Sequence, residues 1–148
     1  MDEIPDRLDG APAPKVRAPW MAADATRLSL ALLFVWFGAL KLAGVSPAEE
    51  LVARTFFFVP RAFLLPALGL AEVVIGILLV VPATVRVARW LLVGHLVGTF
   101  LSLVIVPELC FERAPFVLTT NGEFILKNLV LLSAAWGLMG ARPVRASG

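Results

Sequence analysis

The sequence predicts an all-α membrane protein, a bundle of four transmembrane helices with a short interfacial amphipathic helix between spans one and two. Hydrophobic side chains make up 59% and charged side chains 16% of the 148 residues, whereas soluble domains contain roughly half and a quarter. Four apolar runs are each long enough to cross a hydrocarbon core of roughly 30 Å as a helix. The lipid bilayer is therefore the expected partner of most of the surface.

Prolines mark several of the boundaries between the predicted spans. Pro60 precedes the second span, Pro82 closes it, and Pro107 closes the third, as expected for a residue that cannot continue a helix. The spans and the segments between them form one predicted membrane domain, residues 22–140. The spans cover about residues 22–44, 61–82, 86–107 and 121–140.

A short helix is predicted between the first two spans. Ser46 to Glu49 reads SPAE, which has the form of a capping box with Pro47 at the first helical position and Glu49 placed to reach back. The following residues mix charges with aromatics over too few positions to cross a bilayer. Residues 47–59 therefore predict an amphipathic helix that lies in the interface or folds over the bundle.

Residues 1–21 and 141–148 are predicted to be cytoplasmic tails. The first contains several prolines and mixed charges and has almost nothing to bury, which indicates a flexible segment. The apolar run after it is too long for a cleaved signal peptide. Basic residues are enriched on the cytoplasmic side of membrane proteins, and this bias, with an even number of spans, places both termini there. One side holds Arg7, Lys15, Arg17, Arg27, Arg86, Arg89, Arg142 and Arg145, and the other holds Arg54, Arg61 and Arg113.

Several functional classes receive no support from the sequence. The chain contains no phosphate-binding loop, zinc motif or nucleophile elbow, so catalytic residues are unknown and no self-sufficient enzyme site is visible. Its one cysteine, Cys110, rules out an internal disulfide and a cysteine-based metal cage, and no metal site is expected. The basic residues lie mostly beside apolar segments, where membrane topology explains them. Nucleic-acid binding is therefore not predicted.

Polar residues inside the predicted spans define a candidate site. An ionised side chain within a span costs on the order of 3 kcal/mol, so such residues should face other protein. Lys41 lies near the outer end of span one, Lys127 roughly 9 Å below the outer end of span four, and Glu72 and His95 near mid-membrane. Helical phase places a polar or small stripe on each helix, and a compact bundle would bury these stripes. The predicted polar core or ligand-binding site consists of Lys41, Glu72, His95, Thr99, Glu123, Lys127 and Asn128.

Two further spacings refine this prediction. Glu123 and Lys127 stand four residues apart with the acid first, the favourable order for a pair on one helix. Gly94 and Gly98 form a G-x-x-x-G pair that would permit close approach of span three to a neighbour.

Each candidate has a structural as well as a functional interpretation. The two lysines either bind an anionic or carbonyl-bearing ligand or pair with Glu72 or Glu123. Glu72 is either a proton carrier or the salt-bridge partner of a lysine. His95 either bonds a quinone carbonyl or relays protons, or it is a packed, hydrogen-bonded side chain.

Five motifs between about Leu28 and Leu138 occur in order along the spans: WFGALKL, GVSPAEELVART, LGLAEVVIGILL, GHLVGTFLSLVIVPE and NGEFILKNLVLL. This pattern resembles the DoxX-like family of small bacterial four-helix integral membrane proteins and is similar to the related group linked to reactive-chlorine resistance. The resemblance implies a multi-pass protein of the bacterial inner membrane. It also suggests a quinone as cofactor and membrane oxidoreductase subunits as partners. At Glu123 the chain departs from the pattern, in which an amide is expected.

Three functions are consistent with these observations. The first is a redox- or stress-linked accessory protein that binds a quinone or another small molecule in the polar core. The second is a non-catalytic structural or assembly subunit, in a homo-oligomer or a larger membrane complex. The third is a small-solute transporter, which is ranked last because the chain lacks paired, Gly/Pro-broken spans.

Overall fold

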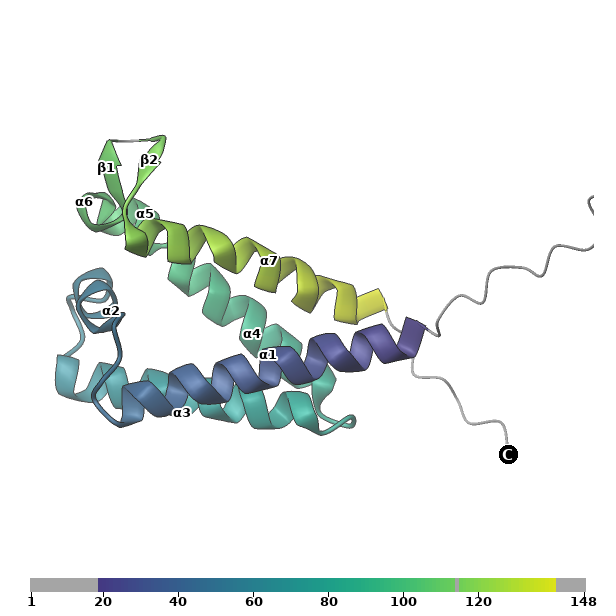
Figure 1. Cartoon of the computed structure of the whole chain (residues 1–148). Coiled ribbons are helices and arrows are strands. Elements are labelled where there is room, and N and C mark those ends of the chain that lie inside the picture. Colours follow the sequence, from purple (N-terminus) through teal and green to yellow (C-terminus); the bar gives the residue numbers. More distant parts are fainter. Residues whose placement is uncertain (1–18, 114, 141–148) are drawn as a thin grey trace, which may run out of the picture.

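The computed structural model describes residues 19–113 and 115–140, and these are mostly helical (Figure 1). Four long helices form the body: α1 (Pro19–Leu42), α3 (Arg61–Val80), α4 (Val85–Phe100) and α7 (Thr120–Gly140). The short elements are α2 (Glu49–Thr55), α5 (Ser102–Ile105), α6 (Pro107–Cys110) and the antiparallel strands β1 (Phe111–Arg113) and β2 (Val117–Leu118). All of these short elements gather at one end of the bundle. The described chain begins and ends at the other (Figure 1).

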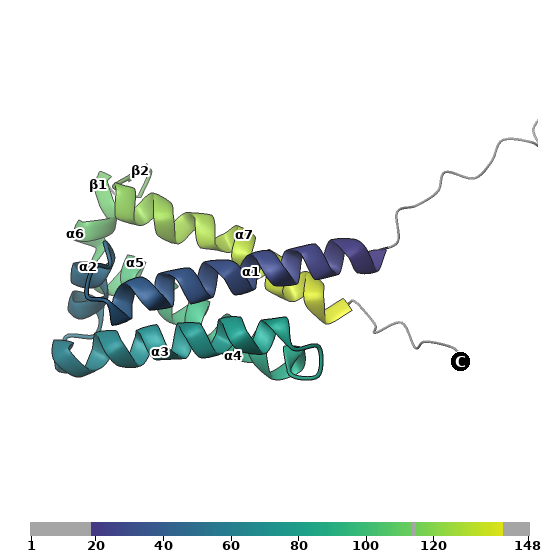
Figure 2. The same ribbon diagram turned by 60° about the horizontal axis from the view of Figure 1, so that its bottom comes forward.

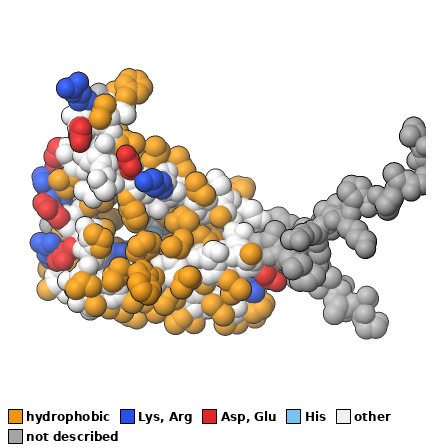
Figure 3. All heavy atoms as spheres, viewed as in Figure 1, with side chains coloured by type: hydrophobic (Ala, Val, Ile, Leu, Met, Phe, Trp, Pro, Cys, Tyr) orange, Lys and Arg blue, Asp and Glu red, His pale blue; other side chains and the backbone are white. Residues whose placement is uncertain are grey.

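Three of the described helical segments are long and apolar enough to cross a membrane: Ala23–Leu42, Arg61–Val80 and Val85–Ile105. This supports the prediction of a multi-pass membrane protein. Helix α7 has comparable length but is not among these three, and its first half carries Glu123, Lys127 and Asn128. Figure 3 shows hydrophobic atoms spread along the body and charged atoms concentrated at the end that carries α2, α6 and the hairpin.

The element boundaries differ from the prediction in physically informative ways. Helix α1 begins at Pro19 rather than at residue 22, and the rest of the two predicted tails lies outside the described residues. The third predicted span is interrupted at Leu101, where α4 gives way to α5, and it ends at Val106 with a non-helical φ of −130°. The segment between the third and fourth predicted spans, for which no regular structure was predicted, contains α6 and the small hairpin of β1 and β2. The all-α class is therefore correct apart from two short strands.

The predicted capping box does not form. Helix α2 begins at Glu49 with Ala48 as its N-cap and no side-chain cap hydrogen bond. The backbone carbonyl of Ser46 accepts the Glu49 N–H at 3.3 Å. The Glu49 carboxylate instead pairs with Arg61 Nε at 2.9 Å, because an ion pair to the start of α3 is within reach. The helix is also shorter than the predicted residues 47–59.

Close helix packing occurs between α1 and α3. A Cβ added at Gly38 would lie 2.5 Å from the Gly69 carbonyl oxygen, and one added at Gly76 would lie 2.8 Å from the Ala31 carbonyl oxygen. Glycine at these positions therefore lets the two backbones touch. The prediction that Gly94 and Gly98 mediate a close approach is wrong, since a Cβ at either would meet no atom within 4 Å.

Two buried hydrophobic clusters divide the interior. The larger joins all four long helices and consists of Leu30, Ala31, Phe34, Ile75, Leu79, Ala88, Leu92, Leu96 and Ala135. The smaller, at the α2 end, consists of Leu51, Val106, Cys110 and Ile125. Burial raises the pKa of the Cys110 thiol, and the neighbouring Glu108 carboxylate raises it further, so the thiol stays protonated at neutral pH.

Candidate functional site

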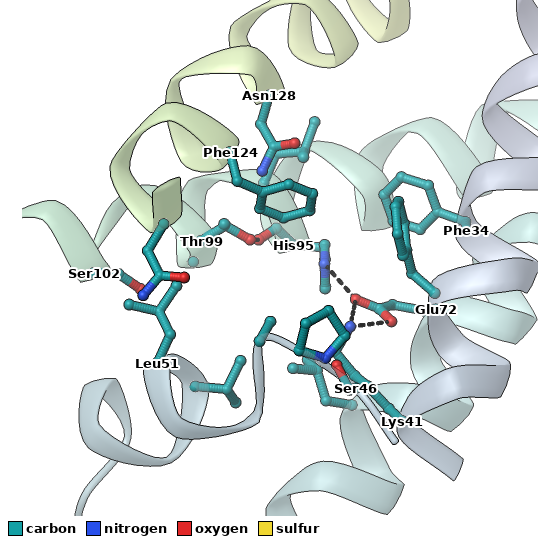
Figure 4. A pocket seen from close by; sticks show the side chains of 18 of the residues that line it. Phe34, Lys41, Ser46, Leu51, Glu72, His95, Thr99, Ser102, Phe124 and Asn128 are labelled. Carbon is teal, nitrogen blue, oxygen red and sulfur yellow. Dashed lines mark hydrogen bonds and ion pairs between the residues drawn. The ribbon is translucent and has the colours of Figure 1, made fainter. Parts of the chain in front are cut away.

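A cavity of about 430 Å³ lies where the polar stripes of the helices meet. Its volume falls within the range of roughly 300–1,000 Å³ that is typical of small-molecule sites. The walls are mostly aliphatic and aromatic, and polar groups are gathered on two opposite sides (Figure 4). Helices α1, α3 and α4 form one side, α7 another, and α2 closes the end.

Lys41, Glu72 and His95 form a connected polar cluster on the first side. The Lys41 ammonium donates to both carboxylate oxygens of Glu72, to Oε1 at 2.9 Å and to Oε2 at 2.7 Å. The His95 Nε2 lies 3.1 Å from the same Oε1. Lys41 is 8% and Glu72 4% exposed. These three residues, predicted from sequence to converge, are brought together from three different helices.

The glycine contact between α1 and α3 positions the lysine. A Cβ at Gly69 would lie 2.9 Å from the Lys41 Cβ, so the lysine stem starts directly against α3, one helical turn from Glu72. The ring of Phe34 packs edge-on against His95, with centroids 5.3 Å apart and planes at 71°. Thr99 donates to the His95 carbonyl at 3.1 Å. The Gly69 contact and the Phe34 ring thus hold the side chains of Lys41, Glu72 and His95 close together.

The charges of this cluster compensate one another. A single buried carboxylate or ammonium would carry a large desolvation cost, which the opposite charge in contact offsets. A neutral His95 that donates its Nε2–H to Glu72 keeps the cluster at zero net charge, and this tautomer is assigned from the acceptor that it faces. An ammonium has three donors, and two of those of Lys41 are used by Glu72. One donor is left for a ligand.

Asn128 faces this cluster from α7. It is 7% exposed and lines the cavity, and Figure 4 shows its amide reaching in from α7 beside Phe124. Within the described residues the amide has no hydrogen-bond partner. Neither polar atom of this amide belongs to the enclosed side-chain atoms without a partner, so both its donor and its acceptor are accessible to a molecule in the cavity.

Five of the seven predicted site residues line the cavity: Lys41, Glu72, His95, Thr99 and Asn128. Glu123 and Lys127 do not. They pair with each other at 3.2 Å on the outer side of α7, with side chains 57% and 74% exposed, so their predicted place in the core is corrected. The helix is rotated so that Asn128 points inward. Lys127, one residue earlier and about 100° around the helix, points out.

Sequence reasoning missed several wall residues, including Phe37, Ser46 and Asn121. A signal for α7 was present in the spacing of Asn121, Phe124, Asn128 and Leu131, which repeat at intervals of three and four residues and share one helix face. The prediction selected the neighbouring face of this helix instead, because that face carries the charged residues Glu123 and Lys127. Phe34 and Phe37 carried no polar signal that distinguished them from other apolar residues of span one.

Comparison of the chain with protein-family models, with curated proteins and with solved structures gives no match. Within residues 19–113 and 115–140, no group of three or more His, Cys, Asp or Glu side chains is placed to hold a metal ion. The chemistry of the cavity is therefore inferred from its own residues. It offers an ammonium donor and an imidazole on one side, a free amide on the other, and aromatic rings between them.

Proposed function

We propose that this chain is a DoxX-like four-span protein of the bacterial inner membrane that binds a lipophilic, carbonyl-bearing small molecule, such as a quinone, in its cavity. The observation that carries the proposal is the apolar space of about 430 Å³, with the Lys41–Glu72–His95 cluster on one side and the Asn128 amide on the other. Within the described residues this amide makes no hydrogen bond, and its atoms are accessible from the cavity.

The shape and chemistry of a quinone suit these groups. One carbonyl oxygen can accept from Lys41, the opposite one can accept from the Asn128 amide, and the flat ring can pack among Phe34, Phe37 and Phe124. Reduction of a quinone consumes protons as well as electrons, and Glu72 and His95 lie where they could pass protons to it. Within residues 19–113 and 115–140 no side-chain cluster is placed to hold a redox metal, so in this proposal the electrons come from a partner. The role is therefore that of an accessory protein beside a membrane oxidoreductase.

The four-span topology is part of the same proposal. Helix α7 has 21 residues, a length of about 31 Å, which is sufficient to cross the hydrocarbon core. In this topology α2 lies at the interface, and both termini share one side. The excess of Lys and Arg in the terminal segments of the sequence supports a cytoplasmic location for them, and reporter fusions at each terminus measure this directly.

Filling the cavity should weaken binding without unfolding the protein. At Gly98 an added Cβ meets no atom within 4 Å, and Gly98 lines the cavity. Gly98→Leu is expected to weaken the binding of a decyl-substituted benzoquinone by at least about tenfold, because one displaced ligand contact of 1.4 kcal/mol has that effect. Asn128→Leu should weaken it similarly. Equilibrium dialysis with protein in lipid nanodiscs measures both.

Gly137→Leu is the matched control, since Gly137 is also a helical glycine with open space around it but lies outside the cavity. It should bind the quinone like the unmodified protein. Failure of the unmodified protein to bind any quinone would remove the proposal, and equal losses in Gly98→Leu and Gly137→Leu would show that the cavity is not the site.

A second candidate function is that of a subunit in a homo-oligomer or larger complex. The Glu123–Lys127 pair is exposed on a proposed span, where lipid offers charged groups no partner. A protein neighbour that covers this pair would remove the cost. Native mass spectrometry from nanodiscs is expected to show a complex that Glu123→Leu with Lys127→Leu weakens, since an apolar pair can face lipid without a protein neighbour. Monomers alone at all protein-to-lipid ratios would argue against it.

A further inference from the structure

The wall of the cavity between α1 and α7 differs from its other walls. Helix α1 packs along α3 through the glycine contacts described above. Figures 1 and 2 show α1 and α7 apart at the end that carries α2 and closer together toward the other end, and in Figure 2 their ribbons cross there. The region where the two helices are separated lies at the level of the cavity. The cavity is lined there by Leu33 and Phe37 of α1 and by Phe124 and Leu131 of α7.

Two phenylalanines close this gap. The rings of Phe37 on α1 and Phe124 on α7 meet edge to face, with centroids 5.8 Å apart and planes at 89°. Both line the cavity, and Phe124 is 41% exposed. These two side chains therefore form the wall of the cavity at this point between α1 and α7. Figure 3 shows the surface hollowed on the face where α7 and α1 diverge.

The end of the cavity beneath α2 is crossed by more polar contacts. Arg54 on α2 pairs with Glu108 at 2.8 Å, Thr55 and Ser102 share a hydrogen bond of 2.8 Å, and Glu49 pairs with Arg61 at 2.9 Å. Opening this end breaks three polar links. Opening the α1–α7 side requires only that an aromatic ring rotate, with no hydrogen bond lost.

Much of the surface beside the gap is apolar. Trp36, next to Phe37, and Val130, on the outer face of α7, are both well exposed. In the proposed topology these side chains face acyl chains rather than water. The exposed Glu123–Lys127 pair lies beside Phe124, so a hydrocarbon chain that leaves the cavity would pass on the Trp36 and Val130 side of that pair.

We infer that the cavity is entered sideways from the bilayer, through a portal between α1 and α7 gated by Phe37 and Phe124, and that its ligand is a lipophilic molecule whose polar ring lies in the cavity while a hydrocarbon chain passes out through the portal. This inference rests on the proposed binding function. It adds the route and the class of ligand, a chain-bearing membrane lipid rather than a water-soluble solute.

The exchange kinetics of a decyl-substituted benzoquinone test the portal, with stopped-flow quenching of tryptophan fluorescence in nanodiscs as the readout. Phe124→Ala should raise the association and dissociation rate constants together by at least about threefold and change their ratio less, since a gate affects rates rather than affinity. Phe124→Leu, which keeps an apolar side chain of similar length, should have a smaller effect in the same direction. It serves as the control if Phe124→Ala fails to fold. A third variant carries Phe37→Cys and Phe124→Cys in a Cys110→Ala background. Once the quinone has bound, a short bifunctional thiol reagent joins the two cysteines across the portal. This cross-link should slow quinone release by at least about tenfold.

Two controls make the test specific. Phe57 and Phe58 form a similar edge-to-face pair, with centroids 5.7 Å apart, but neither lines the cavity, so Phe57→Ala should leave the rates unchanged. Arg54→Ala loosens the α2 end and should also leave them unchanged. Faster exchange in Arg54→Ala, or unchanged release from the cross-linked protein, would overturn the portal while binding itself stands. Absence of quinone binding in the unmodified protein would instead overturn the proposed function.

Discussion

Glu72→Ala is expected to lower the free energy of unfolding by about 3–5 kcal/mol, the usual range when one partner of a buried ion pair is removed. The substitution leaves the Lys41 ammonium, which is 8% exposed, without the two carboxylate oxygens that it contacts at 2.7 and 2.9 Å. It also removes the acceptor of His95. Thermal or SDS-induced unfolding in detergent, followed by circular dichroism, measures the loss.

Two comparisons separate the ion pair from general disruption. Lys41→Met combined with Glu72→Leu removes both charges and should recover a large part of the stability, since apolar replacement of a buried pair is often neutral or stabilising. Glu123→Ala breaks the exposed Glu123–Lys127 pair and should cost about 1 kcal/mol or less in detergent. Equal losses for Glu72→Ala and Glu123→Ala would show that the Lys41–Glu72 pair is not the buried element described above.

The contrast between these two pairs also shows how far the sequence could predict the site. The rise per residue placed Lys41 near the outer end of its span and Glu72 and His95 near mid-membrane, and charge balance identified pairing as one outcome. They could not choose between Lys41 and Lys127 as the partner of Glu72, because both choices satisfy the charge equally. That choice depends on Gly38 and Gly69, whose backbone contact brings the lysine of α1 against α3.

The rotation of α7 illustrates a second limit. A helix that carries Glu123, Lys127 and Asn128 has two polar faces, and periodicity alone cannot say which of them turns inward. Ile125 and Ala135 are fully buried and Asn128 nearly so, and this apolar contact with the two hydrophobic clusters determines the rotation. The Glu123–Lys127 pair stays outside the bundle, because burying the apolar face of α7 lowers the free energy more than an internal ion pair would.

The glycine motif likewise predicted close packing for the wrong helix. Gly94 and Gly98 have the spacing of a packing motif, yet they face open space, whereas Gly38, Gly69 and Gly76 make the backbone contacts. Spacing within one helix does not reveal which partner approaches it. Because Gly94 and Gly98 have no side chains, they leave space for the cavity, which both of them line.

Gly38→Ala is expected to destabilise the bundle by about 1–3 kcal/mol, as overpacking of a close contact does. The new Cβ would lie 2.5 Å from the Gly69 carbonyl oxygen and 2.9 Å from the Val73 backbone nitrogen. These are backbone atoms that cannot move aside as a flexible side chain can, so α1 and α3 must separate. The intrinsic gain of roughly 1 kcal/mol for replacing a helical glycine with alanine offsets only part of that cost.

Gly94→Ala is the matched control because the same substitution there meets no atom within 4 Å. It should raise stability by up to about 1 kcal/mol through helix propensity alone, so the two substitutions should have opposite signs in the same unfolding assay. A separation of α1 from α3 would also draw Lys41 away from Glu72, which couples the helix contact to the polar cluster. Gly38→Ala should therefore lose less stability in the Lys41→Met, Glu72→Leu background than in the unmodified protein, and equal losses in both backgrounds would show that the glycine contact and the ion pair act independently.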